Sequence, residues 1–192
     1  MRNARMLMIS LLFVVASAFA QQNSTSNAAS IFVSDMSITH SSVGTFVNAG
    51  YGGAFDHMFN NHISAELTVT SQRMRQTFTT FSSAGQATYG SYTKTLLPID
   101  ANVSYHFLTD SRWKPYVGVG LRYLSSTVQN VAPLNSYRYT SRSVDPEISG
   151  GVTFQFRPNL GLRLDAKQTV GNGGFVVGDG QTSGSIGLSF RF

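Results

Sequence analysis

Bulky apolar and small polar residues alternate along most of the chain. In the last eight residues, 185–192, the apolar Ile186, Leu188, Phe190 and Phe192 take every second position. A strand with this alternation has one apolar and one polar face, because successive side chains point to opposite sides of a sheet. The pattern therefore predicts a strand and leaves open which of its faces meets water.

Eight segments of the chain show this period of two. They are residues 31–39, 45–55, 62–72, 94–107, 115–125, 144–156, 160–170 and 183–192. Most are close to the roughly 9 to 11 residues that a tilted strand needs to cross a bilayer. No stretch after residue 20 is long and apolar enough for a membrane-spanning helix, so a membrane protein of this sequence has to be a closed barrel.

The connections between the segments alternate in length. The short ones are 56–61, 108–114 and 157–159. The connections on the other side are rich in Ser, Thr, Asn, Gly and Tyr, and they are 73–93, 127–143 and 171–182, together with a short first one at 40–44. Short turns on one side and long loops on the other are typical of outer-membrane barrels.

Aromatic residues stand at the end of every segment that runs toward a short turn or the terminus. Phe55, Phe107 and Phe156 precede the three short turns, and Phe190 and Phe192 close the chain. Rings of aromatic residues mark the two edges of a membrane barrel. We therefore predict that these five residues form the periplasmic girdle, and that the terminal strand also carries the signal for assembly.

Charged residues test the assignment of faces, because that assignment uses only the apolar residues. Within the segments, eight charged residues fall opposite the apolar side: Glu66, Asp100, Arg122, Glu147, Arg163, Asp165, Lys167 and Arg191. An Arg or Lys on the lipid side costs about 2–4 kcal/mol at the middle of the membrane. Their placement favours an apolar face that lies in lipid.

Small side chains on the polar face distinguish a barrel from a soluble β-sandwich. A sandwich shows the same alternation, but its water-exposed face normally carries long charged side chains. Here the polar face contains residues such as Asn102, Ser104, Gly118 and Gly120, which suit the crowded interior of an eight-stranded barrel. We predict an all-β fold, an eight-stranded antiparallel up-and-down transmembrane β-barrel over residues 31–192.

The eight charged residues would then share one narrow lumen, with four cations facing four anions. An unpaired charge there would carry a desolvation cost of several kcal/mol, so we expect the charges to pair with one another. Two hypotheses remain for this network. It is either a structural plug of salt bridges or the lining of a path for a solute.

The first twenty residues predict a secretory signal peptide. Arg2 and Arg5 precede an apolar run at 6–15, and an A-x-A cleavage site ends at Ala20. Cleavage there leaves a polar leader at 21–30, which we expect to be disordered. It also removes two arginines, which lowers the net charge from +5 to +3.

The composition agrees with an exported membrane protein. The chain has no cysteine, so it has no disulfide and no Cys-based metal or thiol site. Charged residues make up 12% of the chain, against roughly 25% in ordinary soluble domains. No run of Lys and Arg with interleaved aromatics follows a phosphate backbone, so we expect no nucleic-acid partner.

The second half of the chain resembles the OmpW-like branch of small outer-membrane β-barrel proteins. The motifs that carry the resemblance are 97–98 (Leu-Pro), 105–107 (Tyr-His-Phe), 115–120 (Pro-Tyr-Val-Gly-Val-Gly), 162–165 (Leu-Arg-Leu-Asp) and 187–192 (Gly-Leu-Ser-Phe-Arg-Phe). The first half agrees only in layout. The polar leader and the short first outer loop depart from the pattern of the family.

The resemblance implies a location in the outer membrane of a Gram-negative bacterium, in contact with outer-membrane lipids and lipopolysaccharide. It implies insertion by the barrel-assembly machinery, which reads a C-terminal aromatic strand. It also implies a narrow channel that passes small, often hydrophobic, solute molecules.

Candidate enzyme chemistry is sparse. His40 lies two residues before Ser42, and such a pair could serve a nucleophile, as in barrels that resemble lipid A deacylases or acyltransferases. No acid follows until Asp56, which we place at the opposite end of the barrel. No His, Asp and Glu residues are spaced for a metal. We therefore predict no catalytic, metal or cofactor site and no enzyme activity.

The outer loops provide an alternative function, that of an adhesin or recognition barrel. Cations and aromatics gather there, at Arg73, Arg75, Tyr137, Arg138, Tyr139 and Arg142. They could contact lipopolysaccharide phosphates or a host partner, or form an ordinary basic and aromatic belt. Our main prediction is a porin-like or structural role, with recognition through the loops as the alternative.

Overall fold

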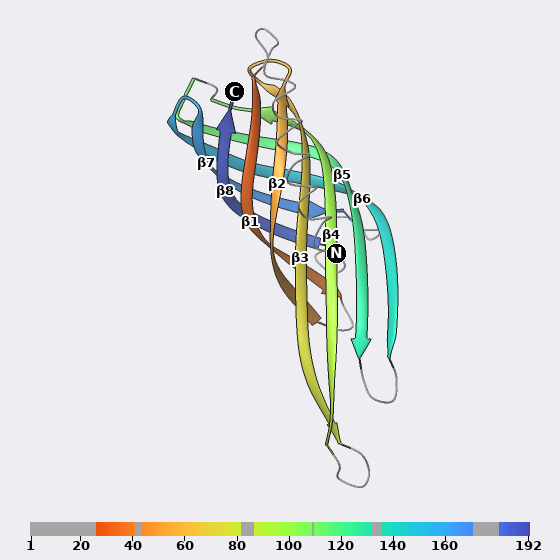
Figure 1. Ribbon diagram of the computed structural model, residues 1–192. Coiled ribbons are helices and arrows are strands. Elements are labelled where there is room, and N and C mark those ends of the chain that lie inside the picture. The colour runs from red at the N-terminus through yellow and green to blue at the C-terminus, as the bar shows by residue number, and fades with distance from the viewer. Residues whose placement is uncertain (1–25, 41–43, 82–86, 109, 132–135, 171–180) are drawn as a thin grey trace.

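The chain forms a closed barrel of eight strands, shown as a computed structural model in Figure 1. The structure describes residues 26–40, 44–81, 87–108, 110–131, 136–170 and 181–192. Its strands are β1 (Asn27–His40), β2 (Gly44–Met58), β3 (Ile63–Phe81), β4 (Ala87–His106), β5 (Trp113–Val131), β6 (Tyr137–Arg157), β7 (Leu160–Thr169) and β8 (Gln181–Arg191). Each pairs antiparallel with the next, and β1 pairs with β8 to close the sheet. The predicted fold is confirmed.

The side chains alternate between the lumen and the outer surface, as the sequence pattern predicts. On β5, Val117, Val119 and Leu121 point outward and are 52%, 64% and 55% exposed. Tyr116 and Arg122 point inward and are 4% and 1% exposed. The apolar face is therefore the outer face of the barrel. No helix in the described ranges is long and apolar enough to cross a membrane.

One lateral row of paired residues shows how strongly the strands are staggered. It runs through Ser141, Ser126, Leu96, Gln72, Gly50, Ser34, Ser185, Asp165 and Gly151. After one circuit the row returns to β6 ten residues further along that strand. A stagger of this size requires the strands to tilt by about 40° from the barrel axis.

Four strands extend far beyond the others at the outer end. β3 to β6 have 19 to 21 residues, whereas β7 and β8 have 10 and 11. Figure 1 shows β3 to β6 reaching past the rest of the sheet on one side. We call the part of these strands beyond the barrel wall, residues 73–81, 87–95, 125–131 and 137–144, the outer extension.

The outer extension corrects the predicted loops at 73–93 and 127–143, which are mostly strand. These segments are rich in Thr, Tyr and Val, which favour strands. On β6 every residue from 137 to 144 is exposed, so both faces of the strand meet solvent there, whereas on β5 Ser126 and Val128 are still buried. Of the third predicted loop, 171–182, residues 171–180 lie outside the described part of the chain.

The first strand begins earlier than predicted, at Asn27 rather than residue 31. Asn27 and Phe192 exchange two main-chain hydrogen bonds of 2.9 Å, so the end of the expected leader is held against the C-terminus. Residues 27–30 are therefore strand and not disordered. The signal peptide at 1–20 and residues 21–25 lie outside the described ranges, and their assignment stays a prediction.

The aromatic residues gather at the short-turn end of the barrel. Phe107, Phe156, Phe190 and Phe192 point outward there and are 42 to 47% exposed. Phe55 also lies on the outer face, but β2 continues to Met58, so Phe55 is not its last residue. The sequence pattern missed two further exposed rings at this edge, Phe59 and Trp113, which are 58% and 54% exposed.

One charged residue lies on the outer face of the wall. Asp35 shares the outward side of β1 with Ile31 and Val33 and is exposed. Its Oδ1 accepts a hydrogen bond of 3.1 Å from the main-chain N–H of Gly184 on β8. The eight predicted lumen charges do not include Asp35, although its position in the alternation already places it outside.

We predict that Val119→Arg destabilises the barrel refolded into lipid vesicles by about 2–4 kcal/mol, because Val119 faces lipid in the middle of the wall. Gln129→Arg, outward on the same strand but in the outer extension, should change the unfolding free energy by less than about 0.5 kcal/mol. Guanidinium unfolding followed by tryptophan fluorescence measures both. Equal losses would contradict a membrane boundary between the two positions.

Candidate functional site in the barrel lumen

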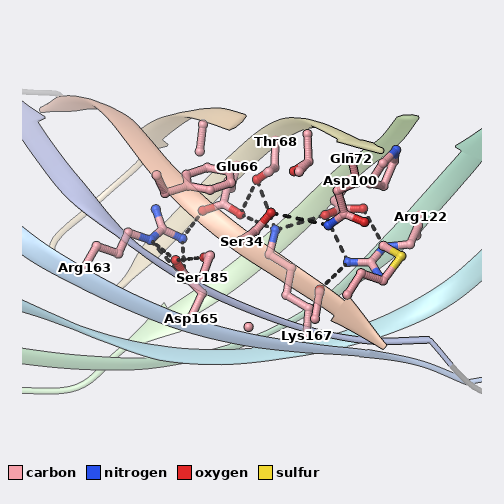
Figure 2. Close-up of a pocket in the computed structure, with 17 residues that line it drawn as sticks. Ser34, Glu66, Thr68, Gln72, Asp100, Arg122, Arg163, Asp165, Lys167 and Ser185 are labelled. Carbon is pink, nitrogen blue, oxygen red and sulfur yellow. Dashed lines mark hydrogen bonds and ion pairs between the residues drawn. The ribbon is translucent and has the colours of Figure 1, made fainter. Parts of the chain in front are cut away.

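Seven of the eight predicted charged residues lie together in the lumen. They come from five strands, β3 to β7, and Figure 2 shows most of them side by side in one continuous network. Glu66, Asp100, Arg122, Glu147, Arg163 and Lys167 are buried, and Asp165 is partly buried. Six ion pairs join these residues to one another, as predicted, and a seventh joins Arg163 to Asp56.

Arg163 on β7 holds three carboxylates at the short-turn side of the network. Its guanidinium pairs with Asp56 at 2.6 Å, with Asp165 at 2.9 Å and, through Nη2, with Glu66. Its Nε and Nη2 also donate to the hydroxyl of Tyr116, at 3.0 and 2.8 Å. All three guanidinium nitrogens have acceptors in this arrangement, and such multiple donation favours Arg over Lys.

Lys167 joins the two halves of the network. Its ammonium group lies 2.9 Å from Glu66 and 3.3 Å from Asp100, and it donates to the hydroxyl of Thr68 at 3.0 Å. Lys167 lies on β7 and its partners lie on β3 and β4. These contacts therefore cross the lumen and do not follow the wall.

Arg122 on β5 forms the second half, toward the outer end. Its Nε lies 2.8 Å from Asp100, and its Nη2 lies 2.7 Å from Glu147 and 3.0 Å from the hydroxyl of Ser183. Asn102 donates to Glu147 at 3.0 Å. Four strands, β4, β5, β6 and β8, thus meet at one guanidinium and its partners.

The network carries more acid than base. Three cations, Arg122, Arg163 and Lys167, face the five carboxylates of Asp56, Glu66, Asp100, Glu147 and Asp165. Neutral donors add to the cations, since the hydroxyls of Thr68 and Ser185 donate to Glu66 and Asp165. Each cation is consequently shared by at least two carboxylates and is costly to remove.

The lumen around these groups is almost completely filled. The cavity between them has a volume of about 20 Å³, which is room for about one water molecule. A Cβ atom added at Gly151 would collide with the hydroxyl of Tyr116, and one added at Gly120 would collide with Asn102. Small residues on the polar face are therefore required by the side chains opposite them.

An apolar layer closes the network on its outer side. Met36, Leu96 and Leu124 form a cluster inside the barrel and are 0%, 0% and 6% exposed. Solvent entering from the outer extension would meet this layer before it reached Arg122. The lumen is thus blocked by two kinds of side chain in series.

Two of the predicted roles need correction. Arg191 lies on the lumen side of β8 at the short-turn end, and it forms none of the described ion pairs. Asp56 takes part instead, because β2 continues past Phe55 and carries Asp56 inward beside Glu66. In the alternation of β2, Gly52, Ala54 and Asp56 all fall on the inward side. This placement of Asp56 was not recognised because residues 56–61 were predicted to be a turn.

Within the described residues, nothing supports the candidate nucleophile pair of His40 and Ser42 or a metal site. Ser42 and the side chain of His40 lie outside the described part of the chain. His106 Nε2 lies 2.9 Å from the hydroxyl of Ser64, but Ser64 is 0% exposed and out of reach of a substrate. No group of three or more His, Cys, Asp or Glu among the described residues is arranged to hold a metal ion.

The outer extension carries cations on one face. One lateral row is Arg75, Thr93, Gln129 and Arg138, and the next is Arg73, Thr95, Thr127 and Thr140. Directly paired residues share a face of the sheet, so arginines flank a strip of hydroxyl and amide groups. Arg142 continues this face beside Ser125, while the rings of Tyr137 and Tyr139 stack at 6.1 Å.

Comparisons with known proteins agree with the fold. The family model described as outer membrane protein beta-barrel domain matches residues 6–192. Ail, the attachment invasion locus protein of Yersinia pestis, in complex with the heparin analogue sucrose octasulfate, has a TM-score of 0.59 and 12% identity over 88% of this chain and 99% of that one. No curated protein sequence matches the chain.

Two further solved barrels are similar in structure. Neisserial surface protein A has a TM-score of 0.53 and 19% identity, over 88% of this chain and 97% of that chain. OprG of Pseudomonas aeruginosa has a TM-score of 0.56 and 12% identity, over 88% of this chain and 95% of that chain. At these identities the likeness concerns the fold alone.

We predict that Arg163→Ala lowers the unfolding free energy by about 3–5 kcal/mol, because three carboxylates lose their shared partner in a buried site. Asp165→Asn should lower the unfolding free energy by less than about 1 kcal/mol. The network has more carboxylates than cations, so the loss of one negative charge is tolerated, and the Asn side chain can still bond to Ser185. Denaturant titration in vesicles compares the two. A larger loss for Asp165→Asn would contradict the excess of acid in the lumen.

Proposed function

We propose that this chain, which belongs to the outer membrane protein beta-barrel domain family, is a closed barrel that acts at the cell surface and does not conduct solutes. Family membership places it in the outer membrane of a Gram-negative bacterium. The observation that carries the proposal is the network of ion pairs that fills the lumen and leaves a cavity of about 20 Å³. In this role the barrel is a rigid anchor for its outer extension.

The energetics of the network support a closed lumen. A solute path would require Arg122, Arg163 and Lys167 to leave their partners, and each is held by at least two carboxylates. Separating buried pairs of this kind costs several kcal/mol per ion. The apolar layer of Met36, Leu96 and Leu124 adds a second barrier, because ions cross dry apolar constrictions poorly.

Porin-like passage is the competing function, and the OmpW-like resemblance of the second half of the chain favours it. Assignment to that branch rests on motifs such as Tyr105-His106-Phe107, which describe barrel strands in general. A narrow channel for small hydrophobic molecules would need a lumen that opens beyond the described state. The conductance experiment below separates the two functions.

The outer extension supports a recognition role. Arg73, Arg75, Arg138 and Arg142 share one sheet face with threonine hydroxyls and a glutamine amide. Arginine beside hydroxyl donors is suited to phosphate and sulfate groups, so we propose that this face binds lipopolysaccharide phosphates. Ail is described with a polysulfated sugar analogue bound, which is a ligand of similar charge.

The C-terminus supports a role in assembly. Phe192 pairs with Asn27 at the seam between β1 and β8, and its ring lies at the exposed edge. We propose that the barrel-assembly machinery reads this terminal strand before the seam closes. We also propose that the protein is not an enzyme, since the charged groups of the lumen network are paired with one another.

We predict no ion conductance for the wild-type protein in planar bilayers, because the lumen holds no continuous water path. The double variant Arg122→Ser with Glu147→Ser should conduct more than the wild type, because it removes both ion pairs of Arg122 together with the bulk of both side chains. Heat-modifiable gel migration checks that both proteins are folded. Stable conductance by the wild type at the level of the variant would reject the closed barrel.

We predict that Arg138→Gln with Arg142→Gln weakens binding to lipopolysaccharide vesicles about tenfold, the loss expected for two exposed charge contacts of under 1 kcal/mol each. Arg157→Gln, at the opposite end of the same strand, is the matched control and should bind like the wild type. Vesicles of dephosphorylated lipid A should remove the difference. An unchanged affinity of the double variant would exclude this face as the binding surface.

A further inference from the structure

Three tyrosines and one lysine gather on the inner face of the outer extension, which is the face that continues the lumen side of β3 to β6 (Figure 1). They lie in two adjacent lateral rows, Tyr92–Asn130–Tyr137 and Lys94–Val128–Tyr139. Directly paired residues share a face of the sheet, and Val128 belongs to the buried, lumen-facing side of β5. This face is therefore opposite to the one that carries the four arginines of the extension.

The inward placement of these tyrosines excludes a role in an aromatic belt. The rings of such a belt lie on the side of the wall that faces lipid. Tyr137 and Tyr139 lie on the other side, and they are nevertheless 44% and 53% exposed. Large aromatic groups that meet water without a membrane to cover them indicate a binding surface.

The tyrosine rings adjoin one another. The centroids of Tyr137 and Tyr139 are 6.1 Å apart, and their planes are 19° from parallel. Burial raises the pKa of the Tyr92 phenol, and so do the neighbouring phenols of Tyr139 and Tyr137. A sugar ring suits such a surface, because its C–H groups pack on the negative face of an aromatic ring. The phenol groups and the Asn130 amide supply donors and acceptors for the sugar hydroxyls.

The charge on the inner face selects an acidic ligand. Residues 73–81, 87–95, 125–131 and 137–144, which make up the outer extension, contain no Asp or Glu. Lys94 is partly buried, and the described ion pairs do not include it. Burial lowers the pKa of its ammonium group, as happens when a cation loses water without gaining an acid. An anionic group on the ligand would supply that partner.

We propose that the inner face of the outer extension binds an acidic oligosaccharide, with sugar rings against Tyr137 and Tyr139 and an acidic group at Lys94. The site goes beyond the proposed surface role and does not depend on it, because it lies on the opposite face from the arginines. Leu96, the next inward residue of β4 after Lys94, belongs to the apolar layer, so the site ends where that layer begins.

Calorimetric titration of the full chain, refolded in a detergent without a sugar head group, tests the sugar contacts. A hexasaccharide of alternating glucuronate and N-acetylglucosamine is the acidic probe, and maltohexaose is the neutral one. We expect Tyr139→Thr to weaken binding of both probes about fivefold, whereas Tyr139→Phe keeps the ring and binds like the wild type. Heat-modifiable gel migration checks folding. Undiminished binding by folded Tyr139→Thr, or no binding by the folded wild type, would overturn the proposal.

The charge contact is tested with the same two probes. Lys94→Gln should weaken the acidic hexasaccharide about threefold and leave maltohexaose unchanged. Arg138→Gln with Arg142→Gln is the matched control on the opposite face, and it should bind both probes like the wild type. Equal losses of both probes in Lys94→Gln, or a loss confined to the arginine variant, would overturn the assignment to the inner face.

Two further measurements separate this site from the proposed lipopolysaccharide surface and from a peptide site. Tyr139→Thr should bind lipopolysaccharide vesicles like the wild type, so either site can fail without the other. A hexapeptide of glutamate should bind more weakly than the acidic hexasaccharide, because it has no sugar rings for the tyrosines. Equal affinity for the peptide, with the same loss in Tyr139→Thr, would reject a saccharide as the ligand.

Discussion

The narrowness of the lumen is the constraint on which the rest of the structure depends. Eight strands enclose a space that side chains fill, so charged groups inside it cannot keep a full shell of water. Arg122, Arg163 and Lys167 therefore have to satisfy, and be satisfied by, the carboxylates that face them. The glycines and serines of the polar face follow from this requirement, because the long side chains need the room that the small ones leave.

Much of this arrangement can be read from the sequence. Alternation identifies all eight strands and their faces because one side of the wall is apolar apart from a few residues such as Asp35. The alternation alone places seven of the network residues inside. The same alternation places Asp35 on the outer face. The prediction did not include Asp35, because it considered only the charged residues on the polar face. The partners within the lumen cannot be predicted, since they depend on the stagger of ten residues between strands that are distant in the chain.

Strand ends are where sequence reasoning fails, and the reason is physical. Alternation requires two different solvents on the two sides of a strand. At the outer end of β6 both sides meet water, so the pattern is lost although the strand continues. At the other end, β2 runs past Phe55 into residues that resemble a turn, which hid Asp56. Arg191 is the opposite case. The alternation correctly places it on the lumen side, but it lies at the edge of the barrel and does not reach the ion-pair network.

The partners of Arg163 have a consequence for how the barrel comes apart. Arg163 and Lys167 belong to β7, and they bind groups on β2 and β3 that lie about a hundred positions earlier in the chain. These contacts form only when the sheet has closed, and opening any seam would expose several charges to hydrocarbon together. The native state is consequently protected by a high barrier to opening as well as by its equilibrium stability. The lifetime of the folded barrel is then set by its unfolding rate.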